Sequence, residues 1–148
     1  MKKECGFPND RNPSATLVTQ GPQIDVVISF KTTETEQNQI PPRLINMPAL
    51  IDTGAKSNLI DSGVAKVLDL PIVNKQKITG SNGTHIVDVY LAEIEIPSLN
   101  QKLYGQFAGV HLTAGELNFG ALLGREFLKN LTMSYDGLTG SVIITNNK

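Results

Sequence analysis

Short apolar segments, each close to a glycine or proline, are the feature that most limits how this chain can fold. The sequence holds 13 glycines and 8 prolines, residues that favour turns and interrupt helices. Apolar or β-branched runs of this length between turns are typical of strands. The pattern predicts an all-β fold, with strands over 15–19, 24–30, 47–51, 77–80, 84–90, 91–96, 103–112, 121–123, 132–135 and 141–144.

One or two short helices are also expected. Asp61-Ser62 can cap a helix that Pro71 ends, with Val64, Val67 and Leu68 on one face. A second short helix is predicted over 125–131. Asn82-Gly83, between two strand-like segments, is the strongest hairpin signal in the chain.

The length of 148 residues fits one domain. Residues 1–14 are polar and contain Pro8 and Pro13, so we expect a flexible or loosely docked arm there and the folded domain over 15–148. Residues 31–46 are rich in threonine, glutamate and glutamine, which predicts an exposed loop or hairpin tip.

Composition excludes several classes of partner. Lysine and arginine number 13 against 14 acids, a net charge of −1, so no strong field attracts nucleic acid or an anionic membrane. A single cysteine excludes an internal disulfide and a cysteine-only metal site. No apolar stretch resembles a secretory signal or approaches the ~20 residues of a membrane span. The expectation is a soluble, cytoplasmic protein without nucleic-acid or membrane partners.

The segment from Ala49 to Ala55 reads Ala-Leu-Ile-Asp-Thr-Gly-Ala and carries the strongest chemical signal. An apolar strand leads directly into Asp52, and Gly54 allows the chain to turn tightly beside it. Such a turn can hold a carboxylate fixed and partly desolvated, as a catalytic acid requires. An ordinary aspartate that caps its own turn would have the same local sequence.

Two further segments bear on that choice. Ala-Leu-Leu-Gly-Arg-Glu-Phe-Leu at 121–128 is an apolar strand followed by a glycine and a helix, and a Gly-Ser-Asn-Gly hairpin at 80–83 precedes it. In this order and spacing, the three segments resemble the retroviral-type, or retropepsin-like, aspartic proteases over roughly residues 15–136. The resemblance implies a closed, barrel-like β monomer that dimerises about a two-fold axis.

The resemblance also implies roles for individual residues. Asp52 would be the catalytic carboxylate, in an active-site loop with Thr53, Gly54 and Ala55. Thr53 would bond to its copy in a second subunit, and Gly54 would lie against the substrate backbone. A mobile flap would comprise Ile78, Gly80, Ser81, Asn82 and Gly83, whereas Gly124 and Arg125 would be structural.

The sequence departs from the family at one informative place. Retroviral enzymes commonly have an acidic residue shortly after the catalytic loop, where it pairs with the arginine of the second motif. Here Lys56 and Ser57 follow Ala55. Arg125 must therefore find another partner, and the charge along the substrate cleft will differ.

Aspartic protease chemistry needs two carboxylates about 3 Å apart that share one proton. Asp61-Ser62-Gly63 is a second triplet of a form seen in this superfamily, but it begins only nine positions after Asp52. That separation is too short for a second lobe, so Asp61 is interpreted as a helix cap. The second carboxylate is then expected from Asp52 of a second copy, in an isologous homodimer.

Other sites are weaker. His85 and His111 are far apart in sequence and no histidine or cysteine neighbours either at ligand spacing, so no metal is expected. Cys5 is interpreted as an unremarkable free thiol. The predicted function is an aspartic endopeptidase without a cofactor, acting on a peptide or protein substrate in a pocket with apolar residues such as Ile78, Ile86, Val110 and Leu122. The alternatives are a catalytically silent dimerisation or peptide-binding module of the same fold, and a protease dedicated to one partner protein.

Overall fold

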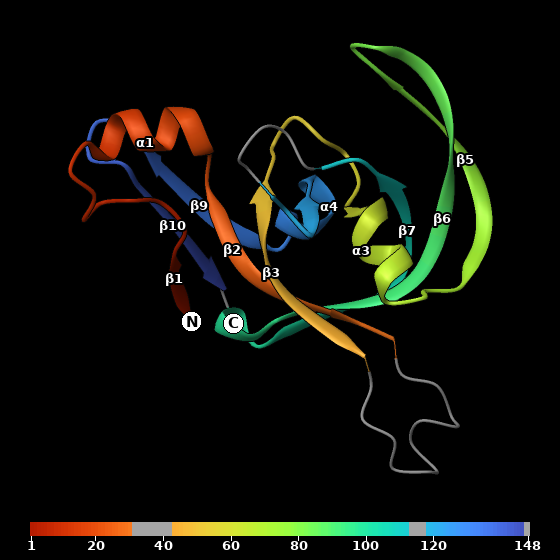
Figure 1. The fold of residues 1–148 in the computed structure, drawn as a ribbon. Coiled ribbons are helices and arrows are strands. Elements are labelled where there is room, and N and C mark those ends of the chain that lie inside the picture. Colours follow the sequence, from red (N-terminus) through yellow and green to blue (C-terminus); the bar gives the residue numbers. More distant parts are fainter. Residues whose placement is uncertain (31–42, 113–117, 147–148) are drawn as a thin grey trace.

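The computed structural model describes residues 1–30, 43–112 and 118–146, and its centre is a closed barrel of six strands (Figure 1). Neighbouring strands follow the order β2-β3-β8-β4-β7-β6, and β6 closes the ring by pairing with β2. A seventh strand, β5, pairs with β6 and rises with it beyond the barrel. Their bounds are β2 Gln23–Ser29, β3 Leu44–Ile51, β4 Leu59–Asp61, β5 Ile72–Gly80, β6 Gly83–Ile96, β7 Gln101–Val110 and β8 Ala121–Leu123. The prediction of a mainly β, barrel-like monomer is confirmed.

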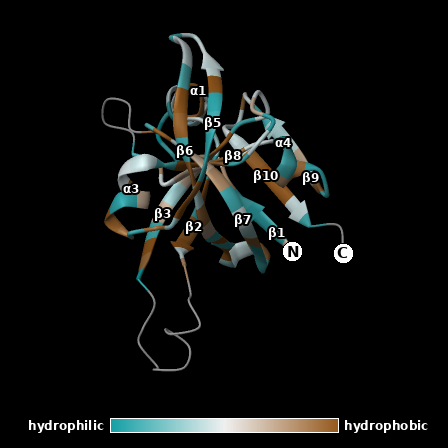
Figure 2. Ribbon diagram, turned by 90° about the vertical axis from the view of Figure 1, so that its right-hand side faces the viewer, coloured by the Kyte–Doolittle hydropathy of each residue, from teal (hydrophilic) through white to brown (hydrophobic). Residues whose placement is uncertain are grey.

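Alternating side chains explain why these segments close on themselves. In β6, Ala92, Ile94 and Ile96 are fully buried, whereas Glu93 and Glu95 between them remain partly exposed. One face of each such strand can therefore pack inward while the other meets water. Figure 2 shows hydrophobic segments concentrated where the barrel strands converge. The largest fully buried side chains include Ile24, Ile28, Ile60, Ile94, Ile96, Leu99 and Leu123.

A second, three-stranded sheet has the order β1-β10-β9 and brings the N-terminus beside the C-terminal hairpin. Its strands are β1 Lys2–Glu4, β9 Leu131–Asp136 and β10 Ser141–Asn146. A flexible or loosely docked arm was expected over residues 1–14. That expectation is wrong for the first residues, because β1 pairs with β10 and Cys5 is only 2% exposed. Cys5 belongs to the hydrophobic core, and this burial raises the pKa of its thiol to about 12. Where a protease domain would begin stays a prediction.

The helices differ from the expectation in number and position. Helix α1, Pro13–Gln20, occupies the place of the strand predicted over 15–19. Proline at the first helical position has a φ angle already suited to a helix, and Gly21 ends the helix at φ 71° with its N–H bonded to the Leu17 carbonyl. The described chain thus has three α-helices, α1, α3 Ser62–Val67 and α4 Arg125–Leu128, and one short 3-10 helix, η1 Pro97–Leu99.

Helix α3 begins after Asp61, as predicted, but its buried face is different. Val64, Ala65 and Leu68 are buried, whereas Val67 is 69% exposed. Helix α4 ends at Leu128, earlier than the predicted end at residue 131, and Leu131 is already the first residue of β9.

The remaining expectation concerned a loop over residues 31–46. Most of that segment, 31–42, lies outside the described residues, whereas 44–46 belong to β3 and pair with β2. In the described part of the chain, no helix has both the length and the apolar character needed to cross a membrane.

Candidate active site

The Asp-Thr-Gly loop is positioned by a strand that lies between its two flanking strands. β8 runs parallel to β3 through the pair Ile51 and Leu123, and antiparallel to β4 through the pair Leu59 and Leu122. The chain over 52–58 must therefore cross the end of β8 to reach β4. The Asp52 N–H donates to the Leu123 carbonyl over 2.9 Å, which continues the β3–β8 ladder into the loop.

Asp52 is oriented by its own loop. Its Oδ1 accepts the Gly54 N–H at 2.8 Å, and its carbonyl accepts the Ala55 N–H at 3.2 Å. A Cβ atom at Gly54 would lie 3.0 Å from Oδ1, so glycine leaves room for this contact. Asp52 is half-buried, whereas Thr53 and Gly54 are exposed. Among the described residues, Oδ1 is thus the oxygen that is held by a hydrogen bond, and the half-buried side chain stays partly accessible.

Arg125 holds the Asp52 loop through two hydrogen bonds. Its Nη1 donates to the Thr53 carbonyl at 2.8 Å, and its backbone N–H donates to the Ala55 carbonyl at 2.9 Å (distances between N and O). A backbone carbonyl therefore takes the place of the acidic partner that Lys56 and Ser57 do not supply. Asn58 also holds the loop, because its Oδ1 accepts the Gly124 N–H at 2.9 Å, a contact that was not predicted. The sequence signal for this contact was the polar side chain of Asn58 immediately before the apolar strand that begins at Leu59.

Gly124 lies directly against the loop backbone. A Cβ atom there would be 2.6 Å from the Ser57 oxygen, 2.7 Å from the Ala55 oxygen and 3.1 Å from the Lys56 oxygen. All three are backbone atoms of one short segment and cannot move independently. Glycine at this position allows α4 to begin in contact with the loop.

Asp61 is fully engaged elsewhere, and its predicted role as a helix cap is confirmed. Its Oδ2 accepts the Val64 N–H of α3 at 3.0 Å, and its Oδ1 accepts the Leu112 N–H at 3.0 Å. The side chain is also buried, with a residue exposure of 6%. These contacts leave Asp61 no free, solvent-facing oxygen with which to activate a water molecule.

The β5–β6 hairpin rises from the same end of the barrel as the Asp52 loop (Figure 1). Gly80 pairs with Gly83 across Ser81-Asn82, and Gly83 has φ 96°, a conformation that favours glycine. Successive cross-strand pairs alternate between two faces. We call one of them the inner face: Asn74, Gln76, Ile78, Gly80, Gly83, His85, Val87 and Val89.

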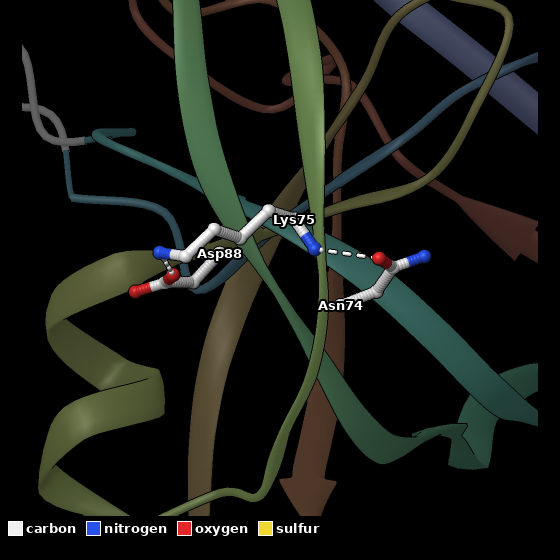
Figure 3. A network of polar contacts seen from close by, with 3 residues as sticks. All are labelled: Asn74, Lys75 and Asp88. Carbon is white, nitrogen blue, oxygen red and sulfur yellow. Dashed lines mark hydrogen bonds and ion pairs between the residues drawn. The ribbon is translucent and has the colours of Figure 1, made fainter.

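The opposite face of the hairpin, which we call the outer face, contains its charged side chains. Its residues are Lys75, Lys77, Thr79, Thr84, Ile86 and Asp88. Lys75 Nζ and Asp88 Oδ1 form an ion pair at 2.9 Å, and the Lys75 N–H also donates to Asn74 Oδ1 (Figure 3). Ile86, which was expected to line a substrate pocket, is 68% exposed on this outer face. The inner face holds neither lysine nor a carboxylate.

Two hollows lie along the inner face. The first, of about 300 Å³, joins the hairpin to the Asp52 loop, because Ser57 and Asn58 line it together with Gln76 and Val89. The second, of about 420 Å³, is at the hairpin tip, and we call it the tip hollow: residues 80–83 with Ile78, His85, Val87, Val110 and His111. Of the four apolar wall residues expected, Ile78 and Val110 line it, whereas Leu122 lines neither hollow.

Both histidines of the chain line the tip hollow, although they are 26 positions apart. His85 comes from β6, and His111 follows β7. The described residues contain no cluster of three histidine, cysteine or acidic side chains that could hold a metal ion.

Comparison with known proteins bears on the architecture. No protein-family model matches the sequence, and no curated protein matches it. Among solved structures, a retropepsin-like aspartic protease from Rickettsia conorii is similar with a TM-score of 0.51 and 16% sequence identity, over 97% of this chain and 91% of that chain. The fold is retropepsin-like. In this chain the Asp52 loop follows β3 of the closed barrel and lies beside β8, which separates β3 from β4.

Proposed function

We propose that this chain is an aspartic endopeptidase whose active site forms between two copies, with Asp52 from each copy as the catalytic pair. The observation that carries this proposal is the geometry of Asp52: one oxygen accepts the Gly54 N–H at 2.8 Å, while the side chain stays partly exposed in an otherwise anchored loop. The fold supports this proposal, because the similar structure from Rickettsia conorii is described as a retropepsin-like aspartic protease.

The need for a second copy follows from the sequence and the contacts of Asp61. The chain contains one Asp-Thr-Gly triplet, and Asp61 is buried with both oxygens engaged. Thr53 and Gly54 are exposed, so the loop is accessible to an identical loop across a two-fold axis.

The proposed reaction uses general acid–base catalysis. Two carboxylates about 3 Å apart share one proton, since two negative charges so close together are strongly unfavourable. The ionised carboxylate removes a proton from a water molecule, which attacks the scissile carbonyl, while the protonated one donates to the carbonyl oxygen. When the tetrahedral intermediate breaks down, a proton passes to the departing amine. The chemistry needs no cofactor.

Substrate would bind extended along the inner face of the hairpin and above the Asp52 loop. Main-chain pairing with an added strand gives affinity for many sequences, whereas hollows for alternate side chains give selectivity. The first hollow has a largely polar lining, with Asn74, Gln76 and Gln106. The tip hollow contains the apolar side chains of Ile78, Val87 and Val110.

Replacement of Asp52 by asparagine tests the chemistry. Asparagine has nearly the same size and keeps an oxygen for the Gly54 N–H, but it cannot accept a proton. We expect kcat/KM on a denatured protein or a mapped peptide to fall by roughly 10²–10⁴-fold, the usual contribution of a positioned acid or base. Asp25→Asn is the matched control, because Asp25 is exposed in β2 and the charge change is the same. Undiminished cleavage by Asp52→Asn would refute the protease proposal.

Subunit mixing tests the shared site. Wild type and an equal amount of Asp52→Asn are allowed to exchange subunits, with exchange confirmed by mass-labelled chains. Random pairing leaves about a quarter of the dimers with two Asp52 side chains, so activity per wild-type subunit should fall to about half. Activity that stays proportional to wild-type chain after exchange would show that one chain is sufficient.

A further inference from the structure

We propose that His85 and His111 make the tip hollow a pH-dependent subsite, which accepts a glutamate side chain of the substrate at acidic pH and disfavours it near neutrality. This inference deepens the proposed function and rests on it, because it names the substrate class of the same cleft. It is carried by the position of both imidazoles in one hollow and by the absence of any other charged group among its described lining residues.

The charge distribution of the hairpin supports this selectivity. Lys75, Lys77 and Asp88 all occupy the outer face, and Lys75 is paired with Asp88 there. From the other side, β7 and the residue after it contribute only Val110 and His111 to the hollow. Histidine is the side chain whose ordinary charge change falls between about pH 5 and 8. Among the described residues that line the hollow, these two imidazoles are therefore the only groups that can carry a charge.

A hydrogen bond defines what His85 presents to a ligand. Its Nε2 lies 3.2 Å from the Asn82 carbonyl oxygen. A carbonyl can only accept, so Nε2 carries the hydrogen and donates. In the neutral ring, Nδ1 is then an acceptor, which is repelled by a carboxylate and suits an amide N–H₂. In the protonated ring, Nδ1 becomes a donor and suits a carboxylate.

The apolar walls select the rest of the side chain. Ile78, Val87 and Val110 can contact the methylene groups of glutamate or glutamine, whose heads differ only in charge and hydrogen-bond character. Glutamine is therefore the matched comparison for glutamate. A substrate glutamate, with an ordinary pKa of about 4.3, is mostly ionised at pH 5.5, so its own titration does not obscure the effect.

The test compares kcat/KM for two peptides at two pH values. The peptides come from a mapped cleavage site and carry glutamate or glutamine at each flanking position in turn. The Glu/Gln ratio at a single pH cancels the titration of the catalytic pair, since both peptides use the same one. For the position that occupies the tip hollow, we expect the wild-type ratio to be about two- to five-fold higher at pH 5.5 than at pH 7.5, as for an ion pair with exposed side chains such as His85 and His111.

The variants assign the effect to the histidines. In His85→Gln/His111→Gln the ratio should become nearly independent of pH, and each single variant should lose part of the change. Lys77→Gln removes a positive charge from the outer face of the same hairpin, so it should behave like wild type. The proposal is overturned if no flanking position shows a pH-dependent ratio in wild type, or if the double variant keeps it.

Binding separates this inference from the catalytic one. Fluorescence anisotropy with dye-labelled peptides and Asp52→Asn measures affinity without cleavage. A glutamate preference at pH 5.5 that disappears in His85→Gln/His111→Gln on this background supports the subsite even if wild type cleaves nothing. If neither peptide binds at millimolar concentration, the subsite is refuted. Cleavage that depends on Asp52 but shows no histidine-dependent preference refutes the subsite alone.

Discussion

Substitution of Gly124 by alanine should displace the Asp52 loop. A Cβ atom would lie 2.6 Å and 2.7 Å from the backbone oxygens of Ser57 and Ala55, closer than real Cβ contacts allow. The backbone of Gly124 is extended, with φ −94° and ψ −162°, so alanine is sterically allowed there in isolation. The cost therefore comes from the contact with the loop.

The magnitude follows from that contact. Overpacking of a close-fitting site typically costs about 1–3 kcal/mol. The same shift would weaken the hydrogen bonds from Gly124 to Asn58 and from Arg125 to Ala55, at about 1 kcal/mol each. We expect a decrease of about 3–5 kcal/mol in the free energy of unfolding, and a Tm lower by roughly 6–20 °C for a chain of this size.

Urea unfolding followed by circular dichroism gives the stability, and peptide cleavage well below Tm gives the activity. We expect kcat to fall by about 100-fold, as for a misplacement of catalytic groups by about 1 Å. Gly105→Ala is the control, because nothing lies within 4 Å of a Cβ atom at this β7 position. A Gly124→Ala protein with wild-type unfolding and wild-type kcat would refute the packing argument.

Three further predictions concern other elements. Gly83→Ala should cost roughly 1–2 kcal/mol of local strain because of φ 96°, and it should lower kcat/KM if the hairpin moves during turnover. Gly80→Ala, with open space and no positive φ, should leave the free energy of unfolding unchanged. Burial tends to raise the pKa of Glu4, but hydrogen bonds from the Ser141 hydroxyl and backbone N–H groups outweigh it and hold the pKa below its ordinary value. A depressed pKa stabilises the fold above the unfolded value, so Glu4→Gln should be about 1 kcal/mol less stable at neutral pH and converge with wild type as pH falls below 4, measured by urea unfolding across pH. Asp61→Ala should cost about 2 kcal/mol in the same assay because two N–H groups lose their acceptor, and equal stability would contradict the capping role.

Local patterns predicted much of the barrel and the loop that follows β3. The strand over 121–123 and the helix cap at Asp61 are determined by residues close to them in sequence, so both could be predicted without the structure. Helix α1 was mistaken for a strand because Thr16, Val18 and Thr19 are β-branched, whereas Pro13 and Gly21 set the actual ends of a helix.

Long-range contacts could not be derived in the same way. β1 is held by Glu4, whose Oε1 accepts the Ser141 hydroxyl hydrogen bond from 137 positions away. Nothing local in residues 1–14 predicts that contact. The outward orientation of Ile86 could have been predicted from the hairpin signal at Asn82-Gly83. Pairing of Gly80 with Gly83 puts Ile78 opposite His85, so Ile86 lies on the other face.

The hairpin that would bind substrate is also the least covered element of the barrel sheet. Eight of the nine residues of β5 are exposed, and only Ile78 is half-buried. Two strands without a covering layer are marginally stable, and the exposed Lys75–Asp88 pair adds at most about 1 kcal/mol. An extended peptide along the inner face would supply the missing contacts to Ile78 and Val87. Substrate binding should therefore order the hairpin. The measurement is amide hydrogen exchange of the Asp52→Asn variant, which should decrease over residues 74–87 when peptide is bound. Unchanged exchange at saturating peptide would mean that the peptide binds elsewhere.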